Sequence, residues 1–312
     1  MMAAGCVFCE RVAGRDFWFA VGETRHSIAA VANHQRSTGS LIVIPRRHVL
    51  ALHELSDEEA LDLFRITRAA TLAVERAYRP DAMYVWQGGR IPLAHIHVRI
   101  CPRYQAVPYT FEANGKLPLT PMAERERIAR RVSAELSHEP QPSGRTPYTF
   151  RGQDPCPVCE HLDADRGDRW PEVARSASSV ALVPSRQPTA GTTLVVPSRH
   201  VLAPGDLPEA EAADLWLLLR AMTGASMRAF GPPSYHVSQY VGALTGEPLD
   251  HLSWRLEPRY QRPPEEDVAV WSLAAVPVPE RRRLAGLLRA AWPPPAPEVQ
   301  EAQEAQDQPL PP

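Results

Sequence analysis

The feature that constrains this chain most is an internal duplication, because it sets the size and number of the folding units. The matching segments are the Cys-x-x-Cys motifs at 6–9 and 156–159, the segments 39–50 and 191–202, and the segments 102–105 and 258–261. The offset grows from 150 to 152 to 156 positions, so the copies differ by short insertions. A repeat unit of this length is a whole domain, which excludes a solenoid of small repeats.

Length and proline distribution divide the chain further. A chain of 312 residues is long enough for about two domains of ordinary size. We predict a first domain over residues 1–138, a Pro- and Gly-rich linker over 139–153 and a second, degenerate copy over 154–293. Residues 294–312 are mostly Glu, Gln, Ala and Pro with few side chains to bury, which predicts a disordered tail.

Charge and hydropathy exclude several classes of protein. The formal net charge of −2 excludes a strongly basic protein that follows nucleic-acid backbones. Apolar runs such as 216–219 are short, so we expect no membrane-spanning helix. The first residues have neither a basic start nor an apolar core, and no secretory signal is visible. We therefore expect a cytoplasmic protein with no nucleic-acid or membrane partner.

Each copy reads in the same order of elements. An apolar strand follows the Cys-x-x-Cys motif, at 41–44 in one copy and 194–196 in the other. An amphipathic helix comes next; in the first copy Ser56 and Glu59 predict a capping box at its start. A histidine-bearing strand and a second helix, begun by Pro121 or Pro279, complete the unit. This order predicts an α+β fold in which each copy is an antiparallel sheet with helices.

The histidine-bearing strand carries the candidate chemistry. Residues 94–100 alternate strictly, so His95, His97 and Arg99 share one face and apolar residues share the other. We expect the apolar face to pack on a helix and the polar face to line a pocket. The second copy, at 250–256, has the same alternation but Ser253 in place of His97. A half-buried strand with satisfied polar residues is the alternative interpretation.

The motifs together resemble the histidine triad superfamily, whose signature is His-φ-His-φ-His-φ-φ, where φ is apolar. The resemblance lies in the Cys-x-x-Cys motif, the segment 39–48 and the run 95–99, and it covers both copies. Two fused copies look like the branch of galactose-1-phosphate uridylyltransferase and diadenosine tetraphosphate phosphorylase. That branch has Gln at the third triad position, whereas this chain has Arg99 and Arg255. The resemblance implies that the two copies form an intramolecular pseudo-dimer.

Cysteines and histidines predict two metal sites. In a reducing compartment, Cys-x-x-Cys with downstream His indicates zinc ligation rather than a disulfide, and a redox pair is the alternative. Each site has four candidate ligands: Cys6, Cys9, His48 and His95 in the first copy, and Cys156, Cys159, His200 and His251 in the second. Four protein ligands close a tetrahedral site, which predicts two structural Zn²⁺ ions per chain. Cys101 is then expected to be a small core residue.

The resemblance implies that His97 is the nucleophile. An unperturbed imidazole is largely neutral near pH 7 and can attack phosphorus without a separate base. Arg99 could hold phosphate oxygens, or it could serve the fold, because Arg255 occupies the same place where the nucleophile is absent. Ser253 has no neighbouring base in the sequence, so the second copy is expected to be catalytically silent.

Candidate nucleotide-binding residues follow from the same resemblance. Gln87 and Gly89 could stand in for part of an Asn-x-Gly motif before the triad, although Ile91 lies where a polar residue is expected. Asn33, Gln35 and Arg36 lie where the family binds base and ribose; a plain turn would also favour Asn.

The function is therefore predicted as a nucleotidyltransferase or nucleotide hydrolase that acts on a nucleotide or sugar-nucleotide phosphate through a nucleotidyl-histidine. One alternative is a zinc-stabilised protein that binds a nucleotide or another anion without turnover. Another is an enzyme of this fold recruited to different chemistry in a biosynthetic pathway. The sequence leaves open the base, the leaving group, the acceptor and whether the chain forms a homodimer.

Overall fold

The structure is a computed structural model that describes residues 5–89, 95–105, 117–136, 148–150, 152, 155–163, 170–242, 249–260 and 274–292. We call residues up to 138 the first half and residues from 154 the second half. The first half contains α1 (Val7–Val12), β1 (Ala20–Glu23), β2 (Ser27–Val31), β3 (Leu41–Pro45), η1 (Leu52–Glu54), α2 (Asp57–Tyr78), β4 (Ala82–Gly89), β5 (Val98–Arg103) and α3 (Met122–Leu136). The second half contains α4 (Pro157–Asp163), β6 (Glu172–Arg175), β7 (Ser179–Leu182), β8 (Arg186–Gln187), β9 (Thr193–Pro197), η3 (Pro204–Asp206), α5 (Glu209–Phe230), β10 (Ser234–Val241), β11 (Trp254–Arg259), β12 (Ala274–Ala275) and α6 (Val278–Ala290).

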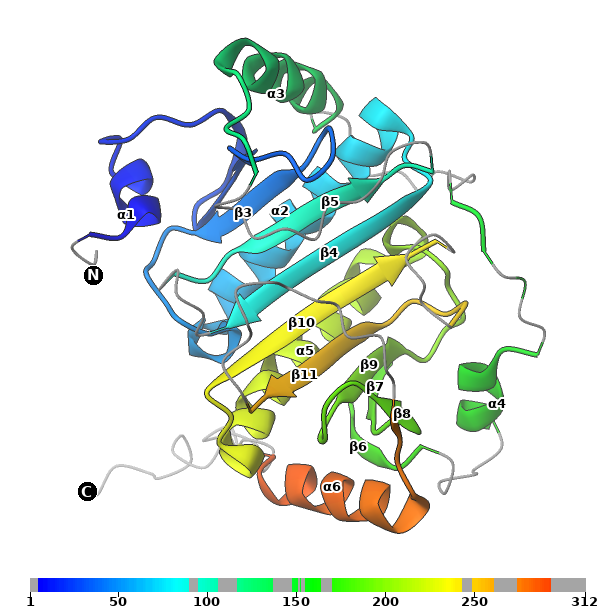
Figure 1. Cartoon of the computed structure of the whole chain (residues 1–312). Helices are drawn as coiled ribbons and strands as arrows, with labels where there is room; N and C mark the ends of the chain where they lie inside the picture. The colour runs from blue at the N-terminus through cyan, green and yellow to red at the C-terminus, as the bar shows by residue number, and fades with distance from the viewer. Residues whose placement is uncertain are drawn as a thin grey trace, which may run out of the picture.

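One antiparallel sheet runs through both halves (Figure 1). Its ten strands have the order β1-β2-β3-β5-β4-β10-β11-β9-β7-β6, so the second half repeats the first half in reverse. The two halves meet where β4 pairs with β10. This architecture confirms the predicted α+β fold with two tandem units in an intramolecular pseudo-dimer. The predicted boundaries at 138/139, 153/154 and 293/294, and the tail, lie outside the described residues.

Long helices α2 and α5 cover one face of the sheet, behind β4 and β10 in Figure 1. The capping box of α2 is present: Ser56 accepts from the Glu59 amide, and the Glu59 carboxylate accepts from the Ser56 amide. The predicted apolar stripe of this helix is buried in the main core. We call the covered side the helix face. No helix within the described ranges has the length and apolar character needed to cross a membrane.

The opposite side of the sheet carries the metal-ligand and triad residues, and we call it the site face. Short helix α1 packs here, with Phe8 against Ile42 and Ile44 of β3 in a second apolar cluster. In the second half Val158 of α4 packs in the same way against Leu194 and Val196. Each Cys-x-x-Cys helix is therefore held on the outer strands of its own half by buried apolar side chains.

A reciprocal interface joins the halves on the helix face. Phe64 of α2 and Trp216 of α5, which are 152 positions apart, stack at 5.1 Å between ring centroids. Arg68 donates to the Pro204 and Leu207 carbonyls and to Glu209 in the second half. Its equivalent, Arg220, donates to the Leu55 carbonyl and to Asp57 in the first. An interface in which equivalent residues exchange contacts is the intramolecular form of an isologous dimer interface.

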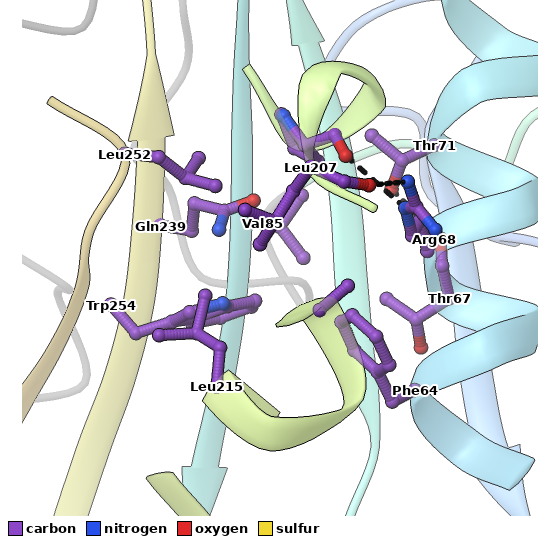
Figure 2. Close-up of a pocket in the computed structure, with 12 residues that line it drawn as sticks. Phe64, Thr67, Arg68, Thr71, Val85, Leu207, Leu215, Gln239, Leu252 and Trp254 are labelled. Carbon is purple, nitrogen blue, oxygen red and sulfur yellow. Dashed lines mark hydrogen bonds between the residues drawn. The ribbon is translucent and has the colours of Figure 1, made fainter. Parts of the chain in front are cut away.

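A small cavity lies beside this interface, between α2, η3, α5 and the sheet (Figure 2). Phe64 and Trp254 form part of its walls, and Arg68 binds the η3 segment at its side. Its interior offers about 20 Å³ to water-sized molecules, which is room for about one water. This cavity is on the helix face, so it is not the pocket that the sequence predicts beside His97.

Candidate functional site

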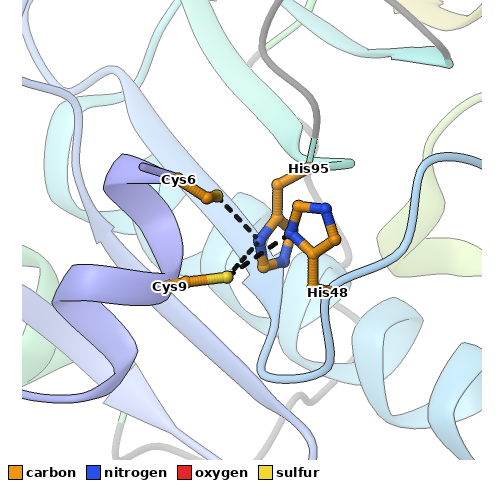
Figure 3. Close-up of side chains that lie close together, drawn as sticks. All are labelled: Cys6, Cys9, His48 and His95. Atoms are coloured by element: carbon orange, nitrogen blue, oxygen red, sulfur yellow. Dashed lines mark hydrogen bonds between the residues drawn. The ribbon is translucent and has the colours of Figure 1, made fainter. Parts of the chain in front are cut away.

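The first metal-ligand cluster brings together residues from three separate parts of the chain (Figure 3). Cys6 is the N-cap of α1 and Cys9 lies within that helix, while His48 and His95 come from segments after β3 and before β5. Sγ of Cys9 is 3.4 Å from Nδ1 of His48, and Sγ of Cys6 is 3.6 Å from Nδ1 of His95. All four predicted ligands of the first half are therefore together.

Backbone pairing outside the regular strands holds this cluster. The amide of Ile96 donates to the Val49 carbonyl at 2.8 Å, which ties the two histidine-bearing segments side by side. The sequence predicts a strand from residue 94, but β5 begins only at Val98. The difference arises because the β3–β5 ladder ends at Val98, and Ile96 bonds instead to Val49 in the segment after His48.

A hydrogen bond to the Pro45 carbonyl determines which nitrogen of the His95 ring can bind a metal ion. Nε2 lies 2.9 Å from the Pro45 carbonyl, which can only accept, so the ring proton is on Nε2 and Nδ1 presents its lone pair to the thiols. Burial lowers the pKa of His95 to about 4, which keeps the ring neutral near pH 7. A neutral imidazole fixed by a carbonyl is the usual arrangement of a histidine ligand.

The second cluster repeats these contacts. Sγ of Cys156 is 3.6 Å from Nδ1 of His251, and Sγ of Cys159 is 3.3 Å from Nδ1 of His200. Nε2 of His251 lies 3.0 Å from the Pro197 carbonyl. Burial and the neighbouring Cys156 thiol raise the pKa of Cys159 above its ordinary range, so ion binding here would release protons.

Both clusters could hold a metal ion. In each, one atom from every ligand lies within 4.8 Å of the others. A tetrahedral ion with bonds of about 2.3 Å to sulfur and about 2.05 Å to nitrogen separates the two ligand atoms by roughly 3.6 Å. The closest S···N separations in the two clusters are 3.3–3.7 Å, which matches this geometry.

His97 lies next to the first cluster but does not take part in it. Its Nδ1 is 3.1 Å from the His95 carbonyl, so the proton is on Nδ1 and the lone pair is on Nε2. The ring of Phe8 lies 5.2 Å from the His97 ring. Only 1% of His97 is exposed, and burial with the nearby Arg99 lowers its pKa to about 3. The expectation that this ring lies open at a pocket is therefore wrong for this conformation, because Phe8 and other neighbours cover it.

Trp86 is a site residue that the sequence analysis missed. It stands directly opposite Arg99 in the β4–β5 pair, and the Arg99 guanidinium lies 5.5 Å from its ring centre. Arg36 lies 6.0 Å from the same ring. Alternation along β4 would have revealed it, since apolar Met83 and Val85 mark the helix face and the residue between Val85 and Gln87 must face the other way.

Gln87 is on the helix face, the side of the sheet that does not carry His97. Its register partners Val98 and Val237 both belong to the main core, and Gln87 itself is fully buried. The structure therefore does not bring Gln87 to the triad residues. Gly89 is the last residue of β4.

The three other residues predicted to bind a nucleotide, Asn33, Gln35 and Arg36, have different contacts. The Gln35 amide donates to the Ala32 and Ser40 carbonyls and accepts from the Gly39 and Ser40 amides, which locks the turn before β3. Asn33 accepts from Arg125 at 2.8 Å. Arg36 alone among them faces Trp86 and the Arg99 side of the sheet.

The second half differs from the first at two positions beside the triad-like segment: Ser253 replaces His97, and Tyr240 replaces Gly88. Alignment of β4 with β10 at an offset of 152 makes Tyr240 the counterpart of Gly88. The Tyr240 ring stacks on Tyr84 at 4.5 Å, and Arg255 lies 5.7 Å from the Tyr240 ring centre. Ser253 is buried, and it is one residue beyond the Gln239–Trp254 pair of the β10–β11 ladder, on the side where Tyr240 follows Gln239. An aromatic side chain thus fills the place that stays small in the first half.

Fold and site define a two-copy α+β protein with a Cys₂His₂ cluster and a triad-like segment in each copy. A family model for the HIT domain matches residues 18–106. The adenosine 5′-monophosphoramidase of Schizosaccharomyces pombe is 33% identical over 102 residues, which cover 31% of this chain and 74% of that protein. Protein hit of Bacillus subtilis is 27% identical over 106 residues, or 33% of this chain and 73% of that protein. The chain belongs to the HIT domain family.

Solved structures extend the likeness to both halves. An ADP-glucose phosphorylase of Arabidopsis thaliana with bound ADP-glucose matches with a TM-score of 0.60 and 13% identity, covering 92% of this chain and 90% of that one. A uridylyltransferase structure matches with a TM-score of 0.55 and 16% identity over 88% of this chain and 80% of that one. At these identities the likeness shows that both halves share the fold of these proteins.

Proposed function

We propose that the chain is an enzyme that transfers or hydrolyses a nucleotidyl group through a covalent intermediate on His97. The observation that carries the proposal is the fixed tautomer: the His95 carbonyl holds the proton on Nδ1, which leaves the lone pair on Nε2. Because Phe8 lies against the buried His97 ring, attack requires the substrate to displace this cover. The resemblance to histidine triad proteins and the adenosine 5′-monophosphoramidase name of one relative support this interpretation.

The reaction divides into two displacements at phosphorus. Nε2 of His97 forms a bond to the α-phosphorus, the bond from phosphorus to the leaving group breaks, and the leaving group takes the electron pair. Water, phosphate or a sugar phosphate then attacks the phosphoramidate, and the P–N electrons return to His97. Splitting the reaction in this way replaces one difficult step with two easier ones.

Two arginines could bind the phosphate oxygens. Arg99 and Arg36 both lie against Trp86 on the site face, and a guanidinium can offer paired hydrogen bonds to a phosphate. Their positive charge would stabilise the charge that develops on the equatorial oxygens.

We propose Zn²⁺ as the ion in both clusters, with a structural role. Two thiolates and two imidazoles are a common donor set for zinc and leave no fifth position for a water. When bound, the ion holds His95 in place, and His95 in turn supplies the carbonyl that orients His97. The chain's own residues provide the nucleophile and the charge stabilisation.

The test is a search for the covalent intermediate. The protein is incubated with a panel of nucleoside 5′-phosphoramidates, nucleoside diphosphates and sugar nucleotides, each of which carries a leaving group on the α-phosphorus, then quenched and examined by intact mass. We expect a nucleotidyl adduct that is absent from His97→Ala and present in the matched second-half control Ser253→Ala. An adduct that persists in His97→Ala, or turnover without any adduct, would contradict the mechanism.

A second candidate is a binding protein that holds a nucleotide or another anion without turnover. The burial of His97 and the presence of Trp86 beside Arg99 favour this alternative. Calorimetric binding of a nucleotide that gives neither adduct nor product would support it over the enzyme.

A further inference from the structure

The second half lies directly beside the strand that neighbours the proposed nucleophile. Gly88 of β4 stands opposite His236 of β10. The β4–β5 ladder ends at the Gln87–Val98 pair. Gly88 and His97 are the next residues beyond this pair, and we infer that they lie across from each other by extending the register one step. Alternation puts all three on the site face, so His97, Gly88 and His236 form one row across the sheet.

The spacing of this row suits a displacement at phosphorus. Neighbouring strands are about 4.8 Å apart, so the Cα atoms of His97 and His236 are roughly 10 Å apart. Gly88 adds no side chain between them. The attacking nitrogen would lie about 3 Å from phosphorus, and the leaving atom would accept a hydrogen bond of about 2.9 Å. With the breaking bond between phosphorus and the leaving atom, the distance from one imidazole nitrogen to the other is roughly 7–8 Å. Two imidazoles that rise from the same face bracket such a group.

His236 is held in a defined state by its neighbours. The Tyr84 hydroxyl lies 2.9 Å from Nε2, and the Trp86 ring lies 5.4 Å from the imidazole. Burial, with Arg259 and Arg255 nearby, keeps the pKa of His236 well below its ordinary value, so the ring is neutral. The Tyr84 hydroxyl can donate to Nε2 or accept from it; the tautomer in which Tyr84 donates has the ring proton on Nδ1, where it can serve as a hydrogen-bond donor.

The equivalent row in the other half has no such pair. By the same offsets its members are Ser253, Tyr240 and Tyr84, and the Tyr240 ring occupies the middle position. The first row also continues to a charged residue, because Glu257 of β11 stands directly opposite His236. An arrangement of two imidazoles with a glycine between them therefore occurs in one of the two equivalent rows and not in the other.

We propose that His236, contributed by the otherwise silent second half, is a catalytic residue that donates a hydrogen bond to the leaving group of the substrate attacked by His97. As the P–N bond forms and the bond to the leaving oxygen breaks, that oxygen takes the electron pair and accepts the hydrogen bond from His236. It then leaves as an anion and takes a proton from water. The inference rests on the proposed function of His97.

The test compares leaving groups. The substrates are the phenyl and p-nitrophenyl esters of AMP and UMP, since phenolate leaves poorly and p-nitrophenolate leaves well without help. Single-turnover rates of adduct formation are measured for wild type, His236→Ala, His236→Gln and the control Ser253→Ala. Thermal midpoint and metal content check that each variant is folded.

We expect His236→Ala to slow the phenyl ester by about 10²-fold and the p-nitrophenyl ester by less than about 3-fold. His236→Gln, which retains an N–H donor, should recover part of the loss, and Ser253→Ala should match wild type. Equal losses with both esters would mean that His236 serves the fold, and unchanged rates would mean that it has no part in the reaction; either result overturns the proposal. If wild type forms no adduct from any ester, the proposed function itself fails, and this inference fails with it.

Discussion

The two halves share a metal-binding frame but differ in the row of residues beside the triad. Both have two thiols, two imidazoles and a proline carbonyl in matching positions, with nearly equal distances. The first half pairs an imidazole outside the metal cluster with a glycine, whereas the second pairs Ser253 with Tyr240. The Cys/His arrangement is therefore common to both halves, whereas the residues at the triad differ between them.

The difference also shows how a second half without a nucleophile can still be needed. It supplies β10, which completes the sheet beside β4, and α5, which covers the helix face together with α2. The reciprocal contacts of Arg68 and Arg220 make the position of each half depend on the other. The predictions below test where the halves are equivalent and where they are not.

Metal removal should give the largest effect, and it should be equal in both halves. We expect Cys9→Ser and Cys159→Ser each to lose one of two bound ions and to lower the unfolding temperature sharply. Structural zinc contributes on the order of 10–16 kcal/mol of apparent free energy in peptide systems. Elemental analysis and thermal melting measure both quantities. A folded variant that keeps two ions would contradict the ligand assignment.

Exchange of the triad residues should separate the halves. His97→Ser, which makes the first half resemble the second, should reduce adduct formation by at least ~10³-fold because the nucleophile is lost. Ser253→His alone should not create a second reactive site, since Tyr240 fills the position of Gly88. An adduct mapped by peptide analysis to position 253 of that single variant would show that space is not what silences this half. The double variant Ser253→His/Tyr240→Gly removes the Tyr240 ring and so tests directly whether that ring keeps the second half unreactive.

A pH effect should be confined to the first half. Glu75 of α2 is only 6% exposed and binds the Tyr148 hydroxyl, and its counterpart in α5 is Met227. Burial raises the pKa of Glu75 from 4.5 to about 7, so between these values the folded state binds more protons than the unfolded state. The free energy of unfolding should then fall as pH rises, by about 3 kcal/mol for this group.

Denaturant unfolding of wild type and Glu75→Gln between pH 4.5 and 7.5 measures this effect. The variant should lose the contribution of Glu75 and be the more stable protein, relative to wild type, at the upper end of the range. Parallel pH curves for the two proteins would show that Glu75 ionises normally in the folded state.

The smallest effect should come from the two arginines of the reciprocal interface. We expect Arg68→Ala to cost about 2 kcal/mol, because the side chain is 9% exposed and its loss leaves the Pro204 and Leu207 carbonyls without this donor. Arg220→Ala, with 21% exposure, should cost about 1 kcal/mol. Urea midpoints at constant m-value measure the difference, and a larger loss for Arg220→Ala would reverse this ranking.

Local patterns were sufficient for the duplication, for the α+β class and for the capping box at Ser56. The eight residues of the two Cys/His clusters could also be identified, since each copy repeats the same residue types in the same order. Side-chain alternation placed His97 and Arg99 on one face. The same rule, applied to β4, would have chosen Trp86 rather than Gln87 as the residue beside Arg99.

The sequence by itself determined the two copies, their fold class, the repeated Cys/His sets and the replacement of His97 by Ser253 in the second copy, because these depend on residue identity and local periodicity. Tertiary structure decided that His97 is buried against Phe8, that Tyr240 replaces the space at Gly88, and that His236 joins the row of His97. These features depend on strand register and on how the halves pair across β4 and β10. Such contacts join residues far apart in the chain, and no local pattern encodes them.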